Sequence, residues 1–345
     1  MKRSNPLLTF AVGMAAGAIF VFQLLPAEND RAIILLEKAL RAPRESVYRG
    51  TSVTYCYLPK PLETRADVWH KGLYRERIGY LTGPLKGYTI GCDGTHNWQS
   101  DANAKTVKVT GKRASEEQTE QRFDLLVRNY RVTLDGAATL AGRPASILTV
   151  KPRNLGNPWR RLWIDQKTFV ALRTDDYLPN DRLKTRTVLE TIDYSPMNDD
   201  LLFSVPASSA GDLPSVPMAA TRAMSAELIK EIYNLDSPRP AYLPPGYELE
   251  RYYLYRCECG DKAVLARFVD GLNTLSIFAV PAQSISGRPA DGSESVDESC
   301  CTIEEQRPAV EVQIGGRGYR LVVLGDIADS EIKRVAESFE KATQS

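Results

Sequence analysis

The chain has 345 residues, more than one hydrophobic core usually serves, so we expect about two domains. Its 44 basic and 43 acidic side chains nearly cancel, which leaves a formal net charge of +1. This balance argues against a nucleic-acid partner, which would need a basic face or stripe.

The N-terminal segment from Pro6 to Pro26 is apolar, carries no charge and follows the basic pair Lys2 and Arg3. It is long enough to cross a bilayer as a helix with its basic flank in the cytoplasm. Two interpretations stay open for residues 1–28. One is a cleaved signal peptide, although the residues before Glu28 make a poor cleavage site, and the other is an anchor in the inner membrane. Both predict a periplasmic or extracytoplasmic protein, tethered through residues 6–26 if the segment is uncleaved.

Residues 29–206 are predicted to form the first domain. A short helix begins at an Asp30 cap and ends at Pro43, and a second helix covers 115–130, where apolar residues recur at helical spacing. Strands with Pro, Gly and Asp-Gly punctuation surround this second helix. One antiparallel sheet with helices over one face is the economical arrangement, and it defines an α+β domain. The predicted strands are 47–58, 66–74, 87–92, 97–99, 106–109, 130–134, 145–151, 161–164, 169–175 and 184–194.

A ligand cavity is one physical function that this domain could have. An antiparallel sheet of many strands curls, and helices that only partly fill its concave side leave an apolar cavity for an acyl chain. The alternative is that the same apolar residues are simply core. The candidate lining residues are Val53, Tyr55, Trp69, Tyr88, Ile90, Leu148, Leu162, Val188 and Ile192.

The second domain, residues 224–345, follows a small, proline-bearing linker over 207–223. It opens with a helix capped by Ser225. A meander of three strands over 247–279 turns at Asp270-Gly271, and an acidic loop over 284–305 follows it. Two more strands, 310–314 and 318–323, and a helix capped by Asp329 close a smaller α+β domain with an antiparallel sheet.

Six cysteines bear on the redox chemistry of an exported chain, where an even number of thiols more often forms disulfides than a metal or catalytic set. The favoured pairing joins Cys257 and Cys259 to Cys300 and Cys301. A tetrathiolate zinc site and a redox switch stay open, although the spacing departs from CxxC knuckles and the acidic neighbours disfavour reactive thiols. Cys56 and Cys92, in separate predicted strands, are either a disulfide or two buried thiols.

Catalysis has little support in the sequence. His70 and His96 are its two histidines, and neither belongs to a nucleophile or metal motif such as GxSxG or HExxH. No glycine-rich phosphate loop is present either. We therefore expect a protein that is not an enzyme, with no cofactor and no metal site.

Several segments together resemble a known family. In the second domain these are YLPPGYELERYY, RFVDGLNTLSIFAV and YRLVVLGDIADSEIKRVAESF. In the first they are LEKALRAPRESVYRGTSVTYCY and RLWIDQKTFVALRTDDY through IDYSPMNDDLLF. The set resembles the MucB/RseB family of periplasmic regulators of the extracytoplasmic stress sigma factor. The CEC and CC thiols and an uncleaved membrane anchor depart from the family pattern.

The resemblance implies a non-enzymatic regulator of two domains. The first domain would be a curved half-barrel sheet similar to the LolA/LolB lipoprotein carriers, and it would sense a lipid or lipoprotein ligand. The second would contact the periplasmic part of a membrane-bound anti-sigma factor and shield it from proteolysis. The alternative function is a lipid or lipoprotein carrier, or a cell-envelope assembly factor, that uses the half-barrel cavity alone.

Overall fold

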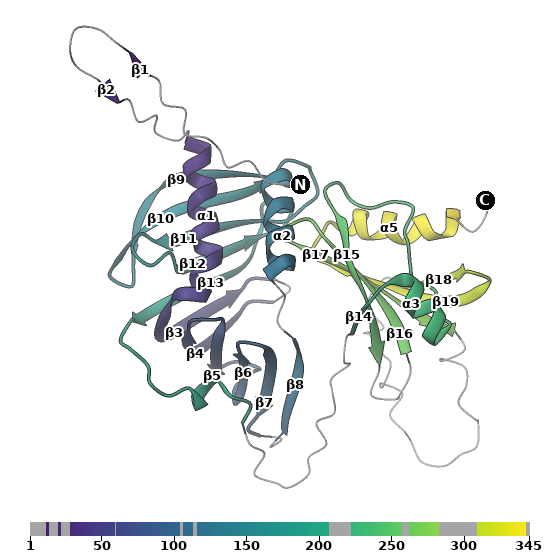
Figure 1. Cartoon of the computed structure of the whole chain (residues 1–345), viewed down its shortest axis with the longest axis horizontal. Helices are drawn as coiled ribbons and strands as arrows, with labels where there is room; N and C mark the ends of the chain where they lie inside the picture. The colour runs from purple at the N-terminus through teal and green to yellow at the C-terminus, as the bar shows by residue number, and fades with distance from the viewer. Residues whose placement is uncertain are drawn as a thin grey trace.

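Two antiparallel sheets, one of 11 strands and one of six, carry most of the architecture (Figure 1). The computed structural model describes residues 12–13, 20–21, 28–58, 60–103, 106–112, 116–206, 222–256, 262–282 and 309–342. We call residues 28–206 the larger unit and residues 222–342 the smaller unit.

The N-terminal segment is described only at β1 (Val12–Gly13) and β2 (Phe20–Val21), which pair as an antiparallel ladder. The other residues of the predicted span 6–26 lie outside the described part. Among the described helices, none combines the length and the apolar character needed to cross a membrane.

The larger sheet is built from two meanders, β3 to β8 and β9 to β13, that join where β3 pairs with β13. It stays open, because β8 and β9 are its two edges. Strand β5 was not predicted separately, since the turn before it uses positive φ at Leu73 and Tyr74, two residue types that do not indicate a turn. The strands are β3 (Val47–Cys56), β4 (Leu62–Lys71), β5 (Arg75–Tyr80), β6 (Tyr88–Asp93), β7 (His96–Asp101), β8 (Thr106–Lys112), β9 (Tyr130–Leu140), β10 (Arg143–Pro152), β11 (Trp159–Asp165), β12 (Ala171–Tyr177) and β13 (Leu183–Asp193).

Two helices, α1 (Glu28–Glu45) and α2 (Glu116–Asn129), lie against one face of strands β9 to β13 (Figure 1). They bury Leu36 and Leu126 against Leu148, Leu162 and other apolar residues of those strands. Full burial of one such side chain stabilises the fold by about 1.5–3 kcal/mol. This packing explains why α1 and α2 form although both helices are polar elsewhere.

Helix α1 is longer than predicted, because Asp30 lies inside it and Pro43 lies in its last turn. The backbone N–H groups of Leu73 and Tyr74 donate to the carbonyls of Arg44 (2.7 Å) and Pro43 (3.2 Å), which satisfies the end of the helix. His70 Nε2 also lies 2.7 Å from the Pro43 carbonyl oxygen. Burial lowers the pKa of the His70 imidazole. Tertiary contacts therefore carry the helix past its proline.

The chain returns to the larger sheet through the short 3-10 helix η1 (Leu201–Phe203). Trp98, fully buried in β7, donates its indole N–H to the Phe203 carbonyl at 2.9 Å. Gly91 is the direct cross-strand partner of Trp98, and a Cβ at Gly91 would lie 2.2 Å from Trp98 Cζ2. The absence of a side chain at residue 91 leaves room for this indole.

The smaller unit is a six-stranded sheet in the order β14-β15-β16-β17-β19-β18. Ser225 Oγ accepts a hydrogen bond from the Leu228 N–H at 3.2 Å, so the predicted cap of α3 is confirmed. Ile229 of α3 and Val335 of α5 are both fully buried in the core of this unit. The elements are β14 (Arg222–Met224), α3 (Ala226–Tyr233), β15 (Glu248–Arg256), β16 (Lys262–Val269), β17 (Thr274–Pro281), β18 (Ala309–Ile314), β19 (Arg317–Gly325) and α5 (Asp329–Ala342).

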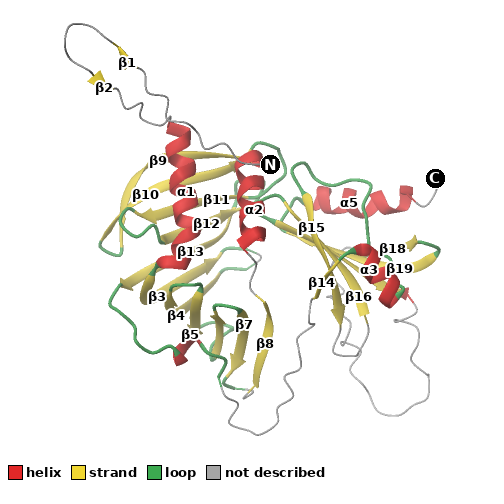
Figure 2. Ribbon diagram, viewed as in Figure 1, coloured by secondary structure: helices red, strands yellow, loops and turns green. Residues whose placement is uncertain are grey.

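The predicted fold class is confirmed: an α+β chain with a larger, open antiparallel sheet under helices and a smaller antiparallel sheet (Figure 2). The two sheets fall on either side of the predicted linker, although β14 begins at Arg222, within the segment 207–223. Most of that segment, residues 207–221, lies outside the described part.

Candidate functional site

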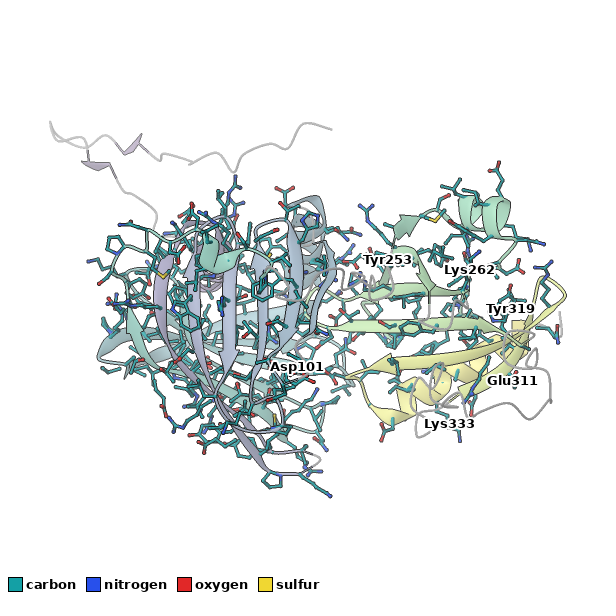
Figure 3. All side chains as sticks on the ribbon, turned by 90° about the horizontal axis from the view of Figure 1, so that it is seen from below. Asp101, Tyr253, Lys262, Glu311, Tyr319 and Lys333 are labelled. Atoms are coloured by element: carbon teal, nitrogen blue, oxygen red, sulfur yellow. The ribbon has the colours of Figure 1, made fainter. Side chains whose placement is uncertain are left out.

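The two units meet along α2, which lies between α1 and the smaller unit (Figure 1). Arg122 Nε on α2 donates to Glu250 Oε1 at 2.7 Å, and Arg267 Nε lies 3.0 Å from Glu250 Oε2. The Glu250 side chain is only 1% exposed, so this carboxylate is held between one guanidinium of each unit. Tyr253 lies on the side of the smaller unit toward the larger one (Figure 3) and accepts a hydrogen bond from Gln118 Nε2 at 3.5 Å. Charge pairing therefore lines one side of the contact.

Asp270 is the centre of the contact between the units, and it is fully buried. Its Oδ1 accepts from the backbone N–H groups of Leu272 (2.9 Å) and Asn273 (2.6 Å), which closes the turn. Its Oδ2 accepts from Tyr130 OH at 2.5 Å, Asn157 Nδ2 at 3.1 Å and Asn273 Nδ2 at 3.2 Å. Tyr130 and Asn157 belong to the larger unit. All five donors are uncharged, and two of them, Tyr130 and Asn157, are lost if the units separate.

The hairpin tip, residues 270–273 between β16 and β17, is inserted against α2. Gly271 has φ +103°, and a Cβ there would lie 2.2 Å from the backbone nitrogen of Leu126. Leu272 packs against the core that contains Leu126, and Asn129 Nδ2 donates to the carbonyls of Gly246 (2.8 Å) and Asp270 (3.0 Å). Only glycine allows this approach.

Burial and the neighbouring Asp270 carboxylate raise the pKa of the Tyr130 phenol well above its usual range. Tyr130 therefore stays a hydrogen-bond donor to Asp270 throughout the neutral range. The same two causes, with burial the larger, raise the pKa of Tyr247 in the smaller unit.

A cavity of about 280 Å³ lies beside the hairpin tip, between the units. Its ion pairs are Arg160–Asp176 (2.6 Å) in the larger unit and Lys184–Asp326 (2.7 Å) across the two units. Cations and carboxylates are balanced in its wall, unlike the apolar cavity expected from the sequence. It is lined by Pro158, Trp159, Arg160, Asp176, Tyr177, Leu178, Lys184, Thr185, Leu272, Asn273, Thr274 and Asp326.

A second charged cluster surrounds Asp175 of β12, whose carboxylate is fully buried. Both Arg173 and Arg186 bind it with two hydrogen bonds each, at 2.6 to 2.9 Å. Burial raises the pKa of the Asp175 carboxyl, but these guanidinium hydrogen bonds outweigh burial and hold it below the usual range. The cluster lies within the larger sheet and stabilises it.

The larger unit matches a known family. That family, described as MucB/RseB N-terminal domain, matches residues 32–196, from α1 into the segment after β13. Residues 32–196 form a MucB/RseB N-terminal domain. A relative in Pseudomonas aeruginosa, described as "Sigma factor AlgU regulatory protein MucB", is 24% identical over 315 residues. The alignment covers 88% of this chain and 89% of the relative, so it includes both units.

Solved structures of MucB have the same fold. The crystal structure of MucB in complex with MucA(peri) gives a TM-score of 0.58 at 21% identity, over 89% of this chain and 97% of that chain. The complex structure of Pseudomonas aeruginosa MucA/MucB gives a TM-score of 0.54 at 20% identity, with the same coverage of both chains. The two-unit fold of this chain is therefore shared with MucB.

The nine predicted cavity residues lie on two different faces of the larger sheet. Val53 pairs directly with Val188 on one face, and Leu148 pairs directly with Leu162 on the other, where α1 and α2 cover them. Because the side-chain direction has a period of two, one strand cannot offer all its apolar residues to one cavity. Val53, Tyr55, Trp69 and Val188 share the first face, and Tyr88, Ile90, Leu148, Leu162 and Ile192 the second. The prediction that all nine line one cavity is wrong.

Two of the six cysteines, Cys56 and Cys92, lie in the described residues. Cys257, Cys259, Cys300 and Cys301 lie outside the described residues. Cys56 is in β3 and Cys92 is in β6, with β4 and β5 between these strands. Since neighbouring strands are about 4.8 Å apart, the two Cα atoms are at least ~14 Å apart, beyond the ~7 Å that a disulfide allows. Of the two alternatives, a Cys56–Cys92 disulfide is excluded.

The residues at the contact between the units were not predicted as a site. Asp270-Gly271 was predicted correctly as a hairpin turn, and its four residues DGLN fit a turn closed by an aspartate side chain. Nothing in the local sequence indicates that Tyr130 and Asn157, more than one hundred residues earlier, donate to the same carboxylate.

Proposed function

We propose that this chain is an exported, non-enzymatic regulator in an extracytoplasmic-function sigma factor pathway, where it binds the periplasmic part of a membrane-bound anti-sigma factor. The observation that carries the proposal is that its similarity to MucB spans both units, and that two solved MucB structures are complexes with MucA. The proposal places the chain in the periplasm, with its N-terminal segment as signal peptide or anchor.

The charged cavity between the units supports a polypeptide partner. Lys184 and Asp326 come from different units and pair at 2.7 Å, and Arg160 and Asp176 pair nearby. Such a wall offers donors and acceptors to a peptide backbone and partners to side chains of either charge. An acyl chain would displace water from these partly exposed ions and offer no hydrogen bond in return, which is unfavourable.

A lipid or lipoprotein ligand of the larger unit is the second part of the proposal. Apolar side chains around the β5–β6 connection support it, because Leu81, Leu85 and Ile90 are each 40 to 45% exposed. This set differs from the predicted cavity lining, of which it keeps only Ile90. A carrier that uses this surface alone, without a protein partner, is the alternative function.

The test is capture of the partner from membranes by the tagged full chain after crosslinking. We expect a single-span anti-sigma protein to be enriched, and Lys184→Glu to reduce its capture because the change reverses a charge in the cavity. Arg49→Glu is the matched control, since Arg49 pairs with Asp193 at 2.9 Å in a solvent-exposed part of the larger sheet. Repeated absence of any anti-sigma protein, with lipid extracted from the same preparation, would favour the carrier.

A further inference from the structure

Two hairpin turns in this chain are built in the same way but hold different things. Asp165 and Asp270 are both fully buried, and the Oδ1 of each accepts backbone N–H groups two and three residues ahead. The second oxygen of Asp165 binds Arg143, within the larger unit. The second oxygen of Asp270 binds Tyr130 and Asn157, in the other unit. The Asp270 turn therefore also joins the two units through hydrogen bonds.

The hairpin tip touches two separate regions of the molecule. Leu272 packs against the core beneath α2, and Leu272, Asn273 and Thr274 also line the cavity between the units. Gly271 approaches the α2 backbone so closely that the tip has no room to move further toward the helix. Any movement of the tip away from α2 changes the core and the cavity wall together.

The chemistry of this contact suits reversible opening. Tyr130 and Asn157 donate hydrogen bonds to Asp270, and Asn129 donates one to the Gly246 carbonyl. Each of these bonds can be replaced by a bond to water when the units separate. The ion pair Lys184–Asp326 joins a lysine that is 33% exposed to an aspartate that is 61% exposed, so it adds little to the closed state. Interfaces between domains that are polar in this way commonly permit relative motion.

The geometry points to the hairpin tip as a latch. When it is closed, residues 270–273 hold the two units as one body and form one wall of the cavity. When it opens, α2 loses its contact with the tip, the core beneath α2 becomes accessible from that side and the cavity widens. The two regions are thus coupled through one element of the smaller unit, and this inference does not rest on the proposed function.

The test compares Asp270→Ala with Asp165→Ala in the full chain, by hydrogen exchange and small-angle X-ray scattering. Both variants lose a fully buried carboxylate and a turn of the same design. For Asp270→Ala we expect exchange of the α2 amides, residues 116–129, to accelerate at least about tenfold, with an increased radius of gyration. For Asp165→Ala we expect faster exchange around residues 143–168 but unchanged scattering and unchanged exchange in α2.

A milder variant keeps the test decisive if Asp270→Ala fails to fold. Tyr130→Phe removes only the hydroxyl that donates to Asp270 at 2.5 Å, and the ring stays to fill its place in the core. It should accelerate exchange of residues 270–273, together with α2, about tenfold. Exchange in α2 that is equal in wild type and Tyr130→Phe, with scattering that is also equal, would overturn the latch. Because no partner protein is used, this outcome leaves the proposed function untouched.

Discussion

Gly271 gives the sharpest prediction about how the two units are held together. An alanine at this position would place its Cβ 2.2 Å from the nitrogen and 2.5 Å from the Cα of Leu126, and 2.7 Å from the Arg122 carbonyl oxygen. All three atoms are backbone atoms of α2, so no side chain can rotate away. The hairpin tip must therefore move out of its place against the helix.

Two separate contributions determine how much Gly271→Ala lowers the free energy of unfolding. An L-residue at φ +103° costs about 1–2 kcal/mol, since this region favours glycine. Movement of the tip by roughly 1 Å also breaks the bonds from Tyr130 and Asn157 to Asp270, and each buried donor left unpaired costs about 1–3 kcal/mol. Together, Gly271→Ala should lower the free energy of unfolding by roughly 3–8 kcal/mol.

The matched control is Gly316→Ala, in the β18–β19 turn of the same unit. Gly316 has φ +78°, and a Cβ there would meet nothing within 4 Å, so only the backbone contribution of about 1 kcal/mol applies. Urea unfolding followed by far-UV circular dichroism, which reports both units, measures both variants. Equal losses for Gly271→Ala and Gly316→Ala would show that the tip is not seated against α2 and would refute this reasoning.

Three other predictions concern the larger unit. Its Asp175 carboxyl has a depressed pKa in the folded state, so the stability it supplies is present above the usual aspartate value near 3.9 and lost as pH falls below it. Asp175→Asn should cost about 3–5 kcal/mol at pH 7, and it should flatten the dependence of unfolding free energy on pH between 4 and 2; an unchanged slope contradicts this. His70 also has a depressed pKa, so its contribution to stability falls as pH drops below about 6.5, and His70→Gln should remove that loss in melts at pH 7 and 5. His96→Gln, at a side chain that is 44% exposed, is the control and should leave the difference in place. Gly91→Ala should displace the Trp98 indole, cost about 1–3 kcal/mol and shift tryptophan emission to longer wavelength; an unshifted spectrum at full stability contradicts it.

Local chemistry made most of the elements predictable. Ser225 before an apolar stripe specifies a helix start, and Asp270-Gly271 between two period-two segments specifies a hairpin, because both depend on groups only a few residues apart. The sequence did not predict element boundaries that depend on a contact with a distant part of the chain. Helix α1 continues through Pro43 because the turn at Leu73 and Tyr74, about thirty residues later, supplies its last hydrogen-bond donors.

The predicted cavity residues also show that local sequence predicts an element but not its tertiary contacts. The nine apolar residues were recognised correctly as strand residues, but the pairing of Val53 with Val188 and of Leu148 with Leu162 places them on opposite faces. Strand register joins segments that are far apart in the chain, and a one-residue change in it reverses every side chain. A list of apolar residues therefore cannot identify a cavity.

The sequence by itself determined the two-sheet α+β class, the positions of most helices and strands, and a resemblance to the MucB/RseB family, because each is written in local periodicity or in continuous segments. Only the tertiary structure decided that the Asp270 turn enters the larger unit and binds Tyr130 and Asn157. A buried carboxylate needs several donors at once, and only folding brings the donors of residues 130 and 157 to the Oδ2 atom of Asp270.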